Sequence, residues 1–202
     1  MTLHTFNMPI TPEQARELKI GDTVMLEKTL FGIRDATLIH MFDRDRRTKL
    51  DMNGHAVIHT APNVHRVPVS NEAPVGYTPF CIGTTTSMRM ERFTRALMER
   101  EGVRLIIGKG GMGPETLASF KEFGGAYLAV VGGAAALETT WIERIVDIDM
   151  DDLHPESLWQ FSIRNFGPLL VGMDSHSGSL FADVQKDVAS RRDAILKSIG
   201  AV

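Results

Sequence analysis

Apolar stretches that are followed at once by a turn and a helix recur along this chain, and this alternation constrains its fold more than any other feature. Thr23–Ile33, Val103–Ile107 and Tyr127–Val131 are rich in β-branched and apolar residues and predict strands. A helix is expected after the first strand, from Asp35, and after the second, from Pro114. Strands that alternate with helices predict an α/β fold in which helices cover a sheet.

The rest of the chain adds elements of the same kinds. Thr11–Gln14 forms a capping box with proline at the first helical position, which predicts a short helix. Ala56–Thr60 and Leu169–Met173 predict further strands, and Asp183–Ile199 predicts an amphipathic helix. We expect one domain over residues 1–202, because this length suits one hydrophobic core and neither a repeat nor a linker interrupts it.

Charge and cysteine content exclude several classes of function. The chain has 22 lysines and arginines against 25 aspartates and glutamates, a formal net charge of −3, which disfavours a nucleic-acid partner. Cys81 is the single cysteine, so this chain alone forms neither a disulfide nor a multi-cysteine metal site. No uncharged stretch is long enough to span a membrane, and the first residues do not resemble a secretory signal. We therefore expect a cytoplasmic protein without nucleic-acid or membrane partners.

Three turns that lead from a strand into a helix each carry one basic residue: Arg34, Arg89 and Lys109. A helix N-terminus presents free backbone N–H groups and a partial positive charge, so a basic side chain there favours a bound carboxylate or phosphate. Three such turns together suit a small dianion. The alternative for each residue is a solvated side chain in the first turn of a helix, with no ligand.

Two of these turns have unusual compositions. Thr84–Ser87 places four hydroxyls before a helix, where Ser87 is the expected N-cap and Thr85 and Thr86 are candidates for contact with a bound anion. Gly108–Gly113 contains four glycines, so its backbone can approach a ligand closely, although the spacing does not match a Walker phosphate loop. Close packing between elements is the alternative explanation for these glycines.

The histidines give weaker signals. His55 and His59 lie four residues apart on one predicted strand, but two ligands without a third are a weak pattern, and we predict no metal site. His176 lies in a turn after an apolar strand and is a candidate functional group. Asp174 in the same turn is the alternative, as an organiser of the turn backbone.

Five blocks of the sequence match one known family: Arg34–Ala36, Gly83–Met90, Gly108–Pro114, Gly132–Ala135 and Asp174–His176. They resemble the β subunit, or C-terminal domain, of class I iron–sulfur hydro-lyases, the family of class I fumarase and L(+)-tartrate dehydratase. The resemblance spans nearly the whole chain and is most specific in the threonine and glycine–lysine blocks. Met88 resembles the tartrate dehydratase version of its block, whereas Gly132–Ala135 is more similar to fumarases, so the substrate stays open.

The resemblance implies a swivelling β/β/α domain, with a mixed sheet and flanking helices, that closes over a 4Fe–4S cluster held by cysteines of a separate α subunit. It implies that Arg34, Arg89 and Lys109 bind the dicarboxylate. Thr85 corresponds to the base that removes a proton beside a carboxylate, and Arg34 assists it by favouring the alkoxide. Thr86, next to Thr85, is grouped with the substrate-binding residues.

The chain departs from the family pattern at four places: Thr37, Ala61, Thr84 and Ser177–Ser179. These departures leave altered specificity and loss of activity as open alternatives.

The function implied is that of a hydro-lyase β subunit, active only with its α subunit, that adds or removes water at a C4 hydroxy-dicarboxylate. The substrate pair is fumarate and malate, or L-tartrate and oxaloacetate. Homodimerisation within a heteromer is also implied. Two other hypotheses stay open: a non-catalytic dicarboxylate-binding module with the same fold, and a dehydratase for a larger or methylated diacid.

Overall fold

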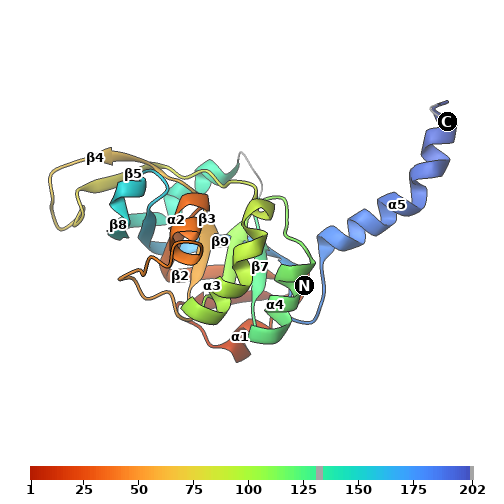
Figure 1. Cartoon of the computed structure of the whole chain (residues 1–202), viewed down its shortest axis with the longest axis horizontal. Coiled ribbons are helices and arrows are strands. Elements are labelled where there is room, and N and C mark those ends of the chain that lie inside the picture. Colours follow the sequence, from red (N-terminus) through yellow and green to blue (C-terminus); the bar gives the residue numbers. More distant parts are fainter. Residues whose placement is uncertain (131–133, 201–202) are drawn as a thin grey trace.

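A seven-stranded mixed sheet, with helices packed against it, forms the body of the molecule (Figure 1). The structure is a computed structural model that describes residues 1–130 and 134–200. The elements in chain order are β1 (Leu3–Asn7), α1 (Pro12–Arg16), β2 (Thr23–Ile33), α2 (Asp35–Phe42), β3 (Ala56–His59), β4 (Asn63–Arg66), β5 (Tyr77–Cys81), the 3₁₀ helix η1 (Ser87–Phe93), α3 (Thr94–Glu101), β6 (Leu105–Gly108), α4 (Pro114–Phe123), β7 (Ala126–Ala129), η2 (Ala134–Trp141), β8 (Ile142–Asp149), η3 (Asp151–Leu153), β9 (Leu158–Met173) and α5 (Leu180–Ser198).

The sheet closes on itself through its longest strand. β1, β2, β3, β6 and β7 are parallel neighbours in that order, whereas β9 is antiparallel to β7, to β8 and to β2. Strands β2, β3, β6, β7 and β9 therefore form a hydrogen-bonded ring. Because five strands are parallel, their carboxyl ends meet at one edge, the usual place for a ligand site in an α/β sheet.

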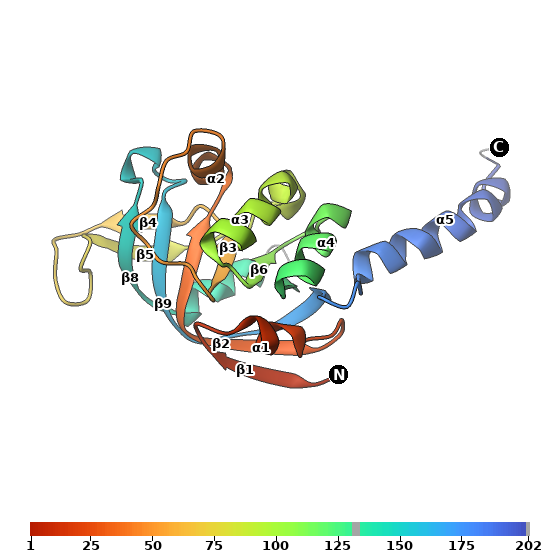
Figure 2. The same cartoon turned by 60° about the horizontal axis from the view of Figure 1, so that its bottom comes forward.

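The five strands of the ring, β2, β3, β6, β7 and β9, place side chains in each of two hydrophobic clusters, because successive side chains point to opposite faces of a sheet. Leu30, Ile58 and Phe161 belong to one cluster, which contains side chains from β1, β2, β3 and β9. The second cluster joins the other face of the sheet to the helices that cover it (Figure 2). Its members from the sheet include Ile33, Val57, Ile106 and Tyr127, and its members from the helices include Leu38, Leu97 and Phe120.

The structure confirms the α/β class and the mixed sheet with flanking helices. The predicted strand over Thr23–Ile33 has the expected bounds. Leu169–Met173 is the end of the much longer β9, because its earlier residues complete the ring by pairing with β2. The predicted strand over Tyr127–Val131 corresponds to β7, and Val131 lies outside the described residues.

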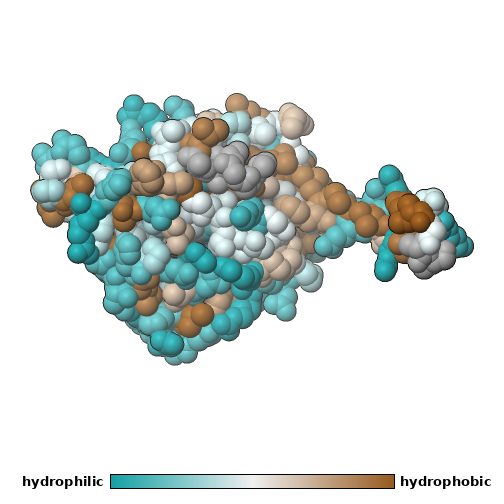
Figure 3. Space-filling view, turned by 90° about the horizontal axis from the view of Figure 1, so that it is seen from above, coloured by the Kyte–Doolittle hydropathy of each residue, from teal (hydrophilic) through white to brown (hydrophobic). Residues whose placement is uncertain are grey.

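The predicted C-terminal amphipathic helix is α5, which begins earlier than expected, at Leu180. It extends away from the body (Figures 1 and 2), and none of its residues is buried. Val184, Val188, Ile195 and Ile199 are exposed, and hydrophobic surface continues from the body on to this helix (Figure 3). None of the described helices is long and apolar enough to cross a membrane.

Candidate functional site

The three basic turns are neighbours because backbone hydrogen bonds join them at the carboxyl edge. The amide of Thr60, just after β3, donates to Ile33 O at the end of β2 over 3.1 Å. The amide of Thr85 donates to His59 O over 2.9 Å, which attaches the threonine loop (residues 83–86) to the end of β3. The amide of Ser87 donates to Lys109 O over 3.0 Å, which attaches the same segment to the end of β6.

The two predicted arginines share one acid, and one of them also contacts the predicted base, Thr85. Asp35 Oδ2 accepts from Arg34 Nε at 3.2 Å and from Arg89 Nη2 at 2.8 Å. The same Arg89 nitrogen donates to Thr85 Oγ1 at 3.0 Å. The structure therefore brings Arg34, Thr85 and Arg89 together, and Asp35 is the residue that connects them.

Glu156, which precedes β9, is a second acid in this cluster. Its Oε1 lies 3.3 Å from Arg34 Nε, and its Oε2 accepts from the amide of Ala36 at 2.8 Å. Its backbone carbonyl accepts from the hydroxyl of the buried Thr37. We call Arg34, Asp35, Arg89 and Glu156 the arginine cluster. Glu156 could not be found from the sequence, because only folding brings it to a helix that begins about 120 residues earlier.

The helix N-termini are not open to a ligand as the sequence suggested. The first turn of α2 already binds the Glu156 carboxylate. The carboxylate of Glu91, from η1, accepts from the amides of Gly113 and Thr116 at 2.9 and 3.0 Å and so occupies the first turn of α4. The prediction of free helix N-termini was wrong for these two helices, because acids from distant elements cap them. The basic side chains, and not these two helix N-termini, are what remain available for an anion.

Lys109 and Thr86 lie beside the cluster but make no side-chain contact with it. Their backbones form a β-bridge to each other, Thr86 is exposed, and Lys109 is half-buried. Among the described residues, none forms an ion pair with Lys109. The structure thus places Thr86 beside Thr85 in the loop and Lys109 opposite Thr86, and within residues 1–130 and 134–200 neither side chain has a hydrogen-bond partner.

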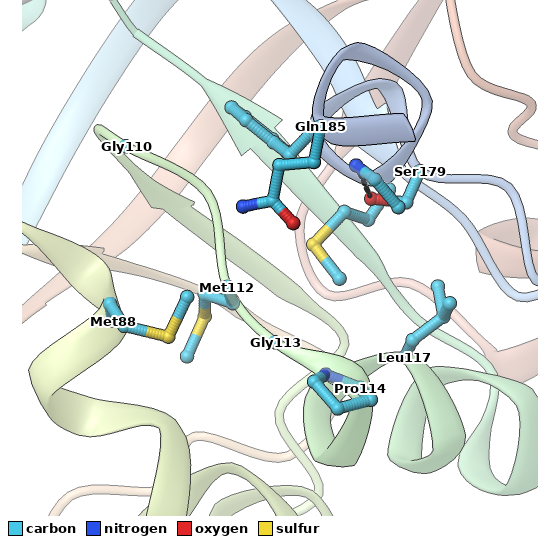
Figure 4. A pocket seen from close by; sticks show the side chains of 11 residues that line it. Met88, Gly110, Met112, Gly113, Pro114, Leu117, Ser179 and Gln185 are labelled. Atoms are coloured by element: carbon cyan, nitrogen blue, oxygen red, sulfur yellow. Dashed lines mark hydrogen bonds between the residues drawn. The ribbon is translucent and has the colours of Figure 1, made fainter. Parts of the chain in front are cut away.

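The glycine loop after Lys109 packs against α5. Gly110 and Gly111 have positive φ angles of 83° and 72°, and a Cβ on Gly111 would lie 2.5 Å from the Phe181 ring. This supports close packing as the reason for the glycines. A mostly apolar cavity of about 220 Å³ lies between this loop, η1, α4 and α5 (Figure 4). It adjoins the basic turns through Met88 and Gly110. Its lining is mostly apolar and contains no basic side chain, with Ser179 and Gln185 as its polar side chains, which does not suit a dianion.

Ser87 does not have the role predicted for it, and it contacts His59, to which the sequence assigned no role. Thr86 is the N-cap of η1, so the prediction that Ser87 caps this helix was wrong. Ser87 instead turns into the protein, where its Oγ lies 2.9 Å from His59 Nδ1 and accepts from Tyr127 Oη at 3.0 Å. Burial lowers the pKa of His59 to about 4, so this side chain is neutral at physiological pH.

His55 does not form a metal site with His59. Its Nδ1 lies 3.0 Å from the backbone oxygen of Asn53, and the described residues contain no group of three histidine, cysteine or acidic side chains able to hold a metal. Cys81 is free.

His176 and Asp174 lie away from the cluster. They follow β9, whose last residue, Met173, pairs with Tyr127 near the start of β7, so the turn is at the opposite edge of the sheet. Asp174 accepts from the amides of Ile20, His176 and Gly178 at 2.8 to 2.9 Å and organises the turn, as the sequence allowed. The structure therefore gives His176 no place at the site. The Gly132–Ala135 block has its two glycines outside the described residues.

The fold and this site define an α/β domain that presents acid-braced arginines and a threonine hydroxyl at the carboxyl edge of a mixed sheet. A sequence model of the family described as "Fumarase C-terminus" matches residues 2–184, and the chain belongs to this family.

Named relatives are similar over nearly the whole chain. This chain is 36% identical to the "L(+)-tartrate dehydratase subunit beta" of Escherichia coli (strain K12) over 192 residues, and this aligned region covers 95% of this chain and 92% of that protein. It is 33% identical over 198 residues to the "Putative L(+)-tartrate dehydratase subunit beta" of Methanocaldococcus jannaschii, covering 96% and 98%. It is 37% identical over 183 residues to the "Putative fumarate hydratase class I" of Geobacillus stearothermophilus, covering 90% of this chain but 34% of that protein.

Proposed function

We propose that this chain is the β subunit of a 4Fe–4S-dependent hydro-lyase that adds or removes water at a C4 hydroxy-dicarboxylate. The observation that carries the proposal is the contact of Arg89 with both Asp35 and Thr85, beside Arg34, in a family whose relatives include tartrate dehydratase β subunits and a class I fumarate hydratase. The substrate pair is L-tartrate and oxaloacetate or fumarate and malate, since relatives of both kinds are similar to the chain.

The arginines supply binding and charge stabilisation. Only the Nε of Arg34 is used by Asp35 and Glu156, so its terminal nitrogens are available for a substrate carboxylate. Removal of a proton beside that carboxylate increases its negative charge, and arginines already directed at it stabilise the charge more as it grows. Lys109 adds a third cation and Thr86 a hydroxyl at the same edge.

Thr85 serves as the base in this proposal. A threonine hydroxyl is a weak base, so its alkoxide needs strong stabilisation. Arg89 provides a positively charged donor to Thr85 Oγ1 at 3.0 Å, and Asp35 holds that guanidinium in place at 2.8 Å. The proposal assigns Thr85 to catalysis as the base and Arg34 as the group that stabilises the growing charge on the substrate carboxylate. It assigns Arg34, Thr85, Thr86, Arg89 and Lys109 to substrate binding.

The cluster in this proposal requires a partner subunit. The residues of this chain do not fit an iron–sulfur cluster, because Cys81 is its single cysteine and no metal-ligating group of three lies in the described part. We therefore place the cluster on an α subunit, within a cytoplasmic heteromer that also contains a homodimer of this chain.

The test is co-expression of the chain with the α subunit under anaerobic conditions, followed by assays with fumarate, malate, L-tartrate and larger or methylated C4 diacids. We expect turnover of at least one of these substrates and no turnover by either subunit alone. An assembled, cluster-loaded complex that is inert to all of them contradicts the proposal. Calorimetry on the single chain identifies the alternative, a non-catalytic dicarboxylate-binding module, which would bind a diacid tightly without a partner.

A further inference from the structure

A buried chain of hydrogen bonds lies directly beneath the threonine loop. It consists of Tyr127 on β7, Ser87 at the start of η1 and His59 at the end of β3, and we call it the buried chain. Tyr127 and Ser87 are 0% exposed and His59 is 1% exposed. None of the three was needed for substrate binding, and a buried polar chain of this kind stabilises one particular arrangement only if its donors and acceptors all match.

Each hydrogen bond of the buried chain has one donor and one acceptor when the hydrogens point from Tyr127 towards His59. Tyr127 Oη donates to Ser87 Oγ at 3.0 Å, which leaves the Ser87 hydrogen free to donate to His59 Nδ1 at 2.9 Å. This arrangement requires an unprotonated Nδ1, and burial keeps His59 neutral by lowering its pKa to about 4. Burial also raises the pKa of Tyr127 to about 12, so its hydroxyl keeps its hydrogen.

Gly108 provides the space for Ser87 between the other two side chains. It lies on β6, the strand between β3 and β7, and a Cβ at this position would be 1.9 Å from Ser87 Oγ and 3.2 Å from Tyr127 Oη. A residue with a side chain would therefore displace the Ser87 hydroxyl. The glycine that begins the glycine–lysine block thus has a packing role.

The buried chain is connected to the candidate base through the backbone. Thr85 is two residues before Ser87, and its amide donates to the backbone oxygen of His59 at 2.9 Å. The Ser87 amide donates to Lys109 O at 3.0 Å. His59 therefore contacts both ends of the segment from Thr85 to Ser87, one through its backbone and one through its ring.

We infer that His59, Ser87 and Tyr127 are positioning residues that hold Thr85 at the site by anchoring the segment that carries it. The inference rests on the proposed function, and it adds residues that touch neither substrate nor cluster. A displacement of about 1 Å in a reacting group can reduce a rate about 100-fold. Loss of the buried chain should therefore reduce kcat while leaving the arginines, and hence KM, little changed.

The experiment compares Ser87→Ala, Tyr127→Phe and the double variant in the assembled complex. We expect kcat to fall about 10- to 100-fold for Ser87→Ala and less for Tyr127→Phe, with KM within about threefold of wild type. The double variant should match Ser87→Ala, because Tyr127 acts only through Ser87. The matched control is Ser119→Ala, which removes a buried hydroxyl that donates to Glu115 O on α4, remote from the loop.

A second measurement separates this inference from the proposed function. Hydrogen exchange of the Thr85 amide in the same complexes should be faster in Ser87→Ala and Tyr127→Phe, and unchanged in Ser119→Ala. A wild-type complex that turns over no diacid contradicts the proposed function, while the exchange rates still decide whether the loop is anchored. The inference is overturned if folded Tyr127→Phe or Ser87→Ala keeps wild-type kcat, or wild-type Thr85 exchange, or if the effects of the two single variants on kcat multiply in the double variant.

Discussion

The arginine cluster and the buried chain both hold the threonine loop, but they differ in charge and in exposure. The side chains of Arg34 and Arg89 are 29% and 51% exposed, and both are paired with acids. The buried chain below them is neutral and shielded from water. Ion pairs in contact with water contribute little to folding stability, whereas buried groups that lose a partner are costly. The exposed cluster is therefore suited to binding a ligand, and the buried chain to maintaining the local structure.

The largest expected effect comes from a substitution in the exposed arginine cluster. Arg89→Met removes the donor to Thr85 Oγ1 and one cation from the site. We expect kcat/KM to fall about 1,000-fold, equivalent to about 4 kcal/mol, with little change in Tm. The control is Arg92→Met, in the same helix, whose guanidinium pairs with Asp43. Equal kinetic losses in the two variants would show that Arg89 has no special role.

The pH dependence of the free energy of unfolding tests the buried chain. The unfolded chain protonates His59 near pH 6.5, but the folded chain does so only near pH 4, because the side chain is buried. The contribution of His59 to the free energy of unfolding is therefore present above pH 6.5 and is lost as the pH falls to 4, by up to about 3 kcal/mol.

Chemical denaturation of wild type and His59→Gln between pH 4 and 7.5 measures this contribution. The stability advantage of wild type should shrink as the pH falls. Burial also raises the pKa of Glu138 to about 7, which gives the opposite slope between pH 4.5 and 7, but this contribution is common to both proteins and cancels in their difference. A difference independent of pH would mean that His59 is not a neutral buried group.

Gly108→Ala disturbs the buried chain without changing a polar group. The added Cβ would overlap Ser87 Oγ, so we expect a loss of about 2 kcal/mol in the free energy of unfolding and a lower Tm. The matched control is Gly83→Ala in the threonine loop, where an added Cβ meets nothing within 4 Å and should leave Tm unchanged. Thermal denaturation of both variants makes the comparison, and a Tm for Gly108→Ala equal to that of the control would contradict the packing role.

Glu156→Gln should have the smallest effect, and it tests how the charge of Glu156 affects anion binding by the arginine cluster. An amide oxygen can still accept from the amide of Ala36, but the negative charge beside Arg34 is lost. We expect the Ki of a dicarboxylate inhibitor to fall about threefold at low salt, and the difference to shrink at high salt. The control is Glu122→Gln, which neutralises an exposed acid of α4 that pairs with Arg95 of α3, and it should leave Ki unchanged. A weaker inhibitor in Glu156→Gln would indicate that Glu156 mainly orients Arg34.

The sequence was informative where a property depends on neighbouring residues. The β-branched run of β2, the turn that carries Arg34 and the helix from Asp35 follow from local propensity, and the structure has them at the predicted positions. Parallel strands then place two of the basic turns, those after β2 and β6, at one edge. The threonine loop follows β5, which pairs with β4 in a separate antiparallel sheet, and its backbone hydrogen bonds to His59 and Lys109 bring it to the same edge. The sequence was misleading where a contact comes from a distant part of the chain. Ser87 is a residue type typical of N-caps, but Gly108 leaves space for its side chain to turn into the protein.

By itself, then, the sequence determined the α/β alternation, the basic residue in each of three turns and the family blocks, because each of these depends on short-range pattern. Only the tertiary structure decided that Glu156 and Glu91 occupy two helix N-termini, that Asp35 joins two arginines, and that His59 is buried against Ser87. These contacts join residues 22 to 120 positions apart in most cases, and local sequence pattern does not specify hydrogen bonds and ion pairs at such separations, because they depend on how the elements pack.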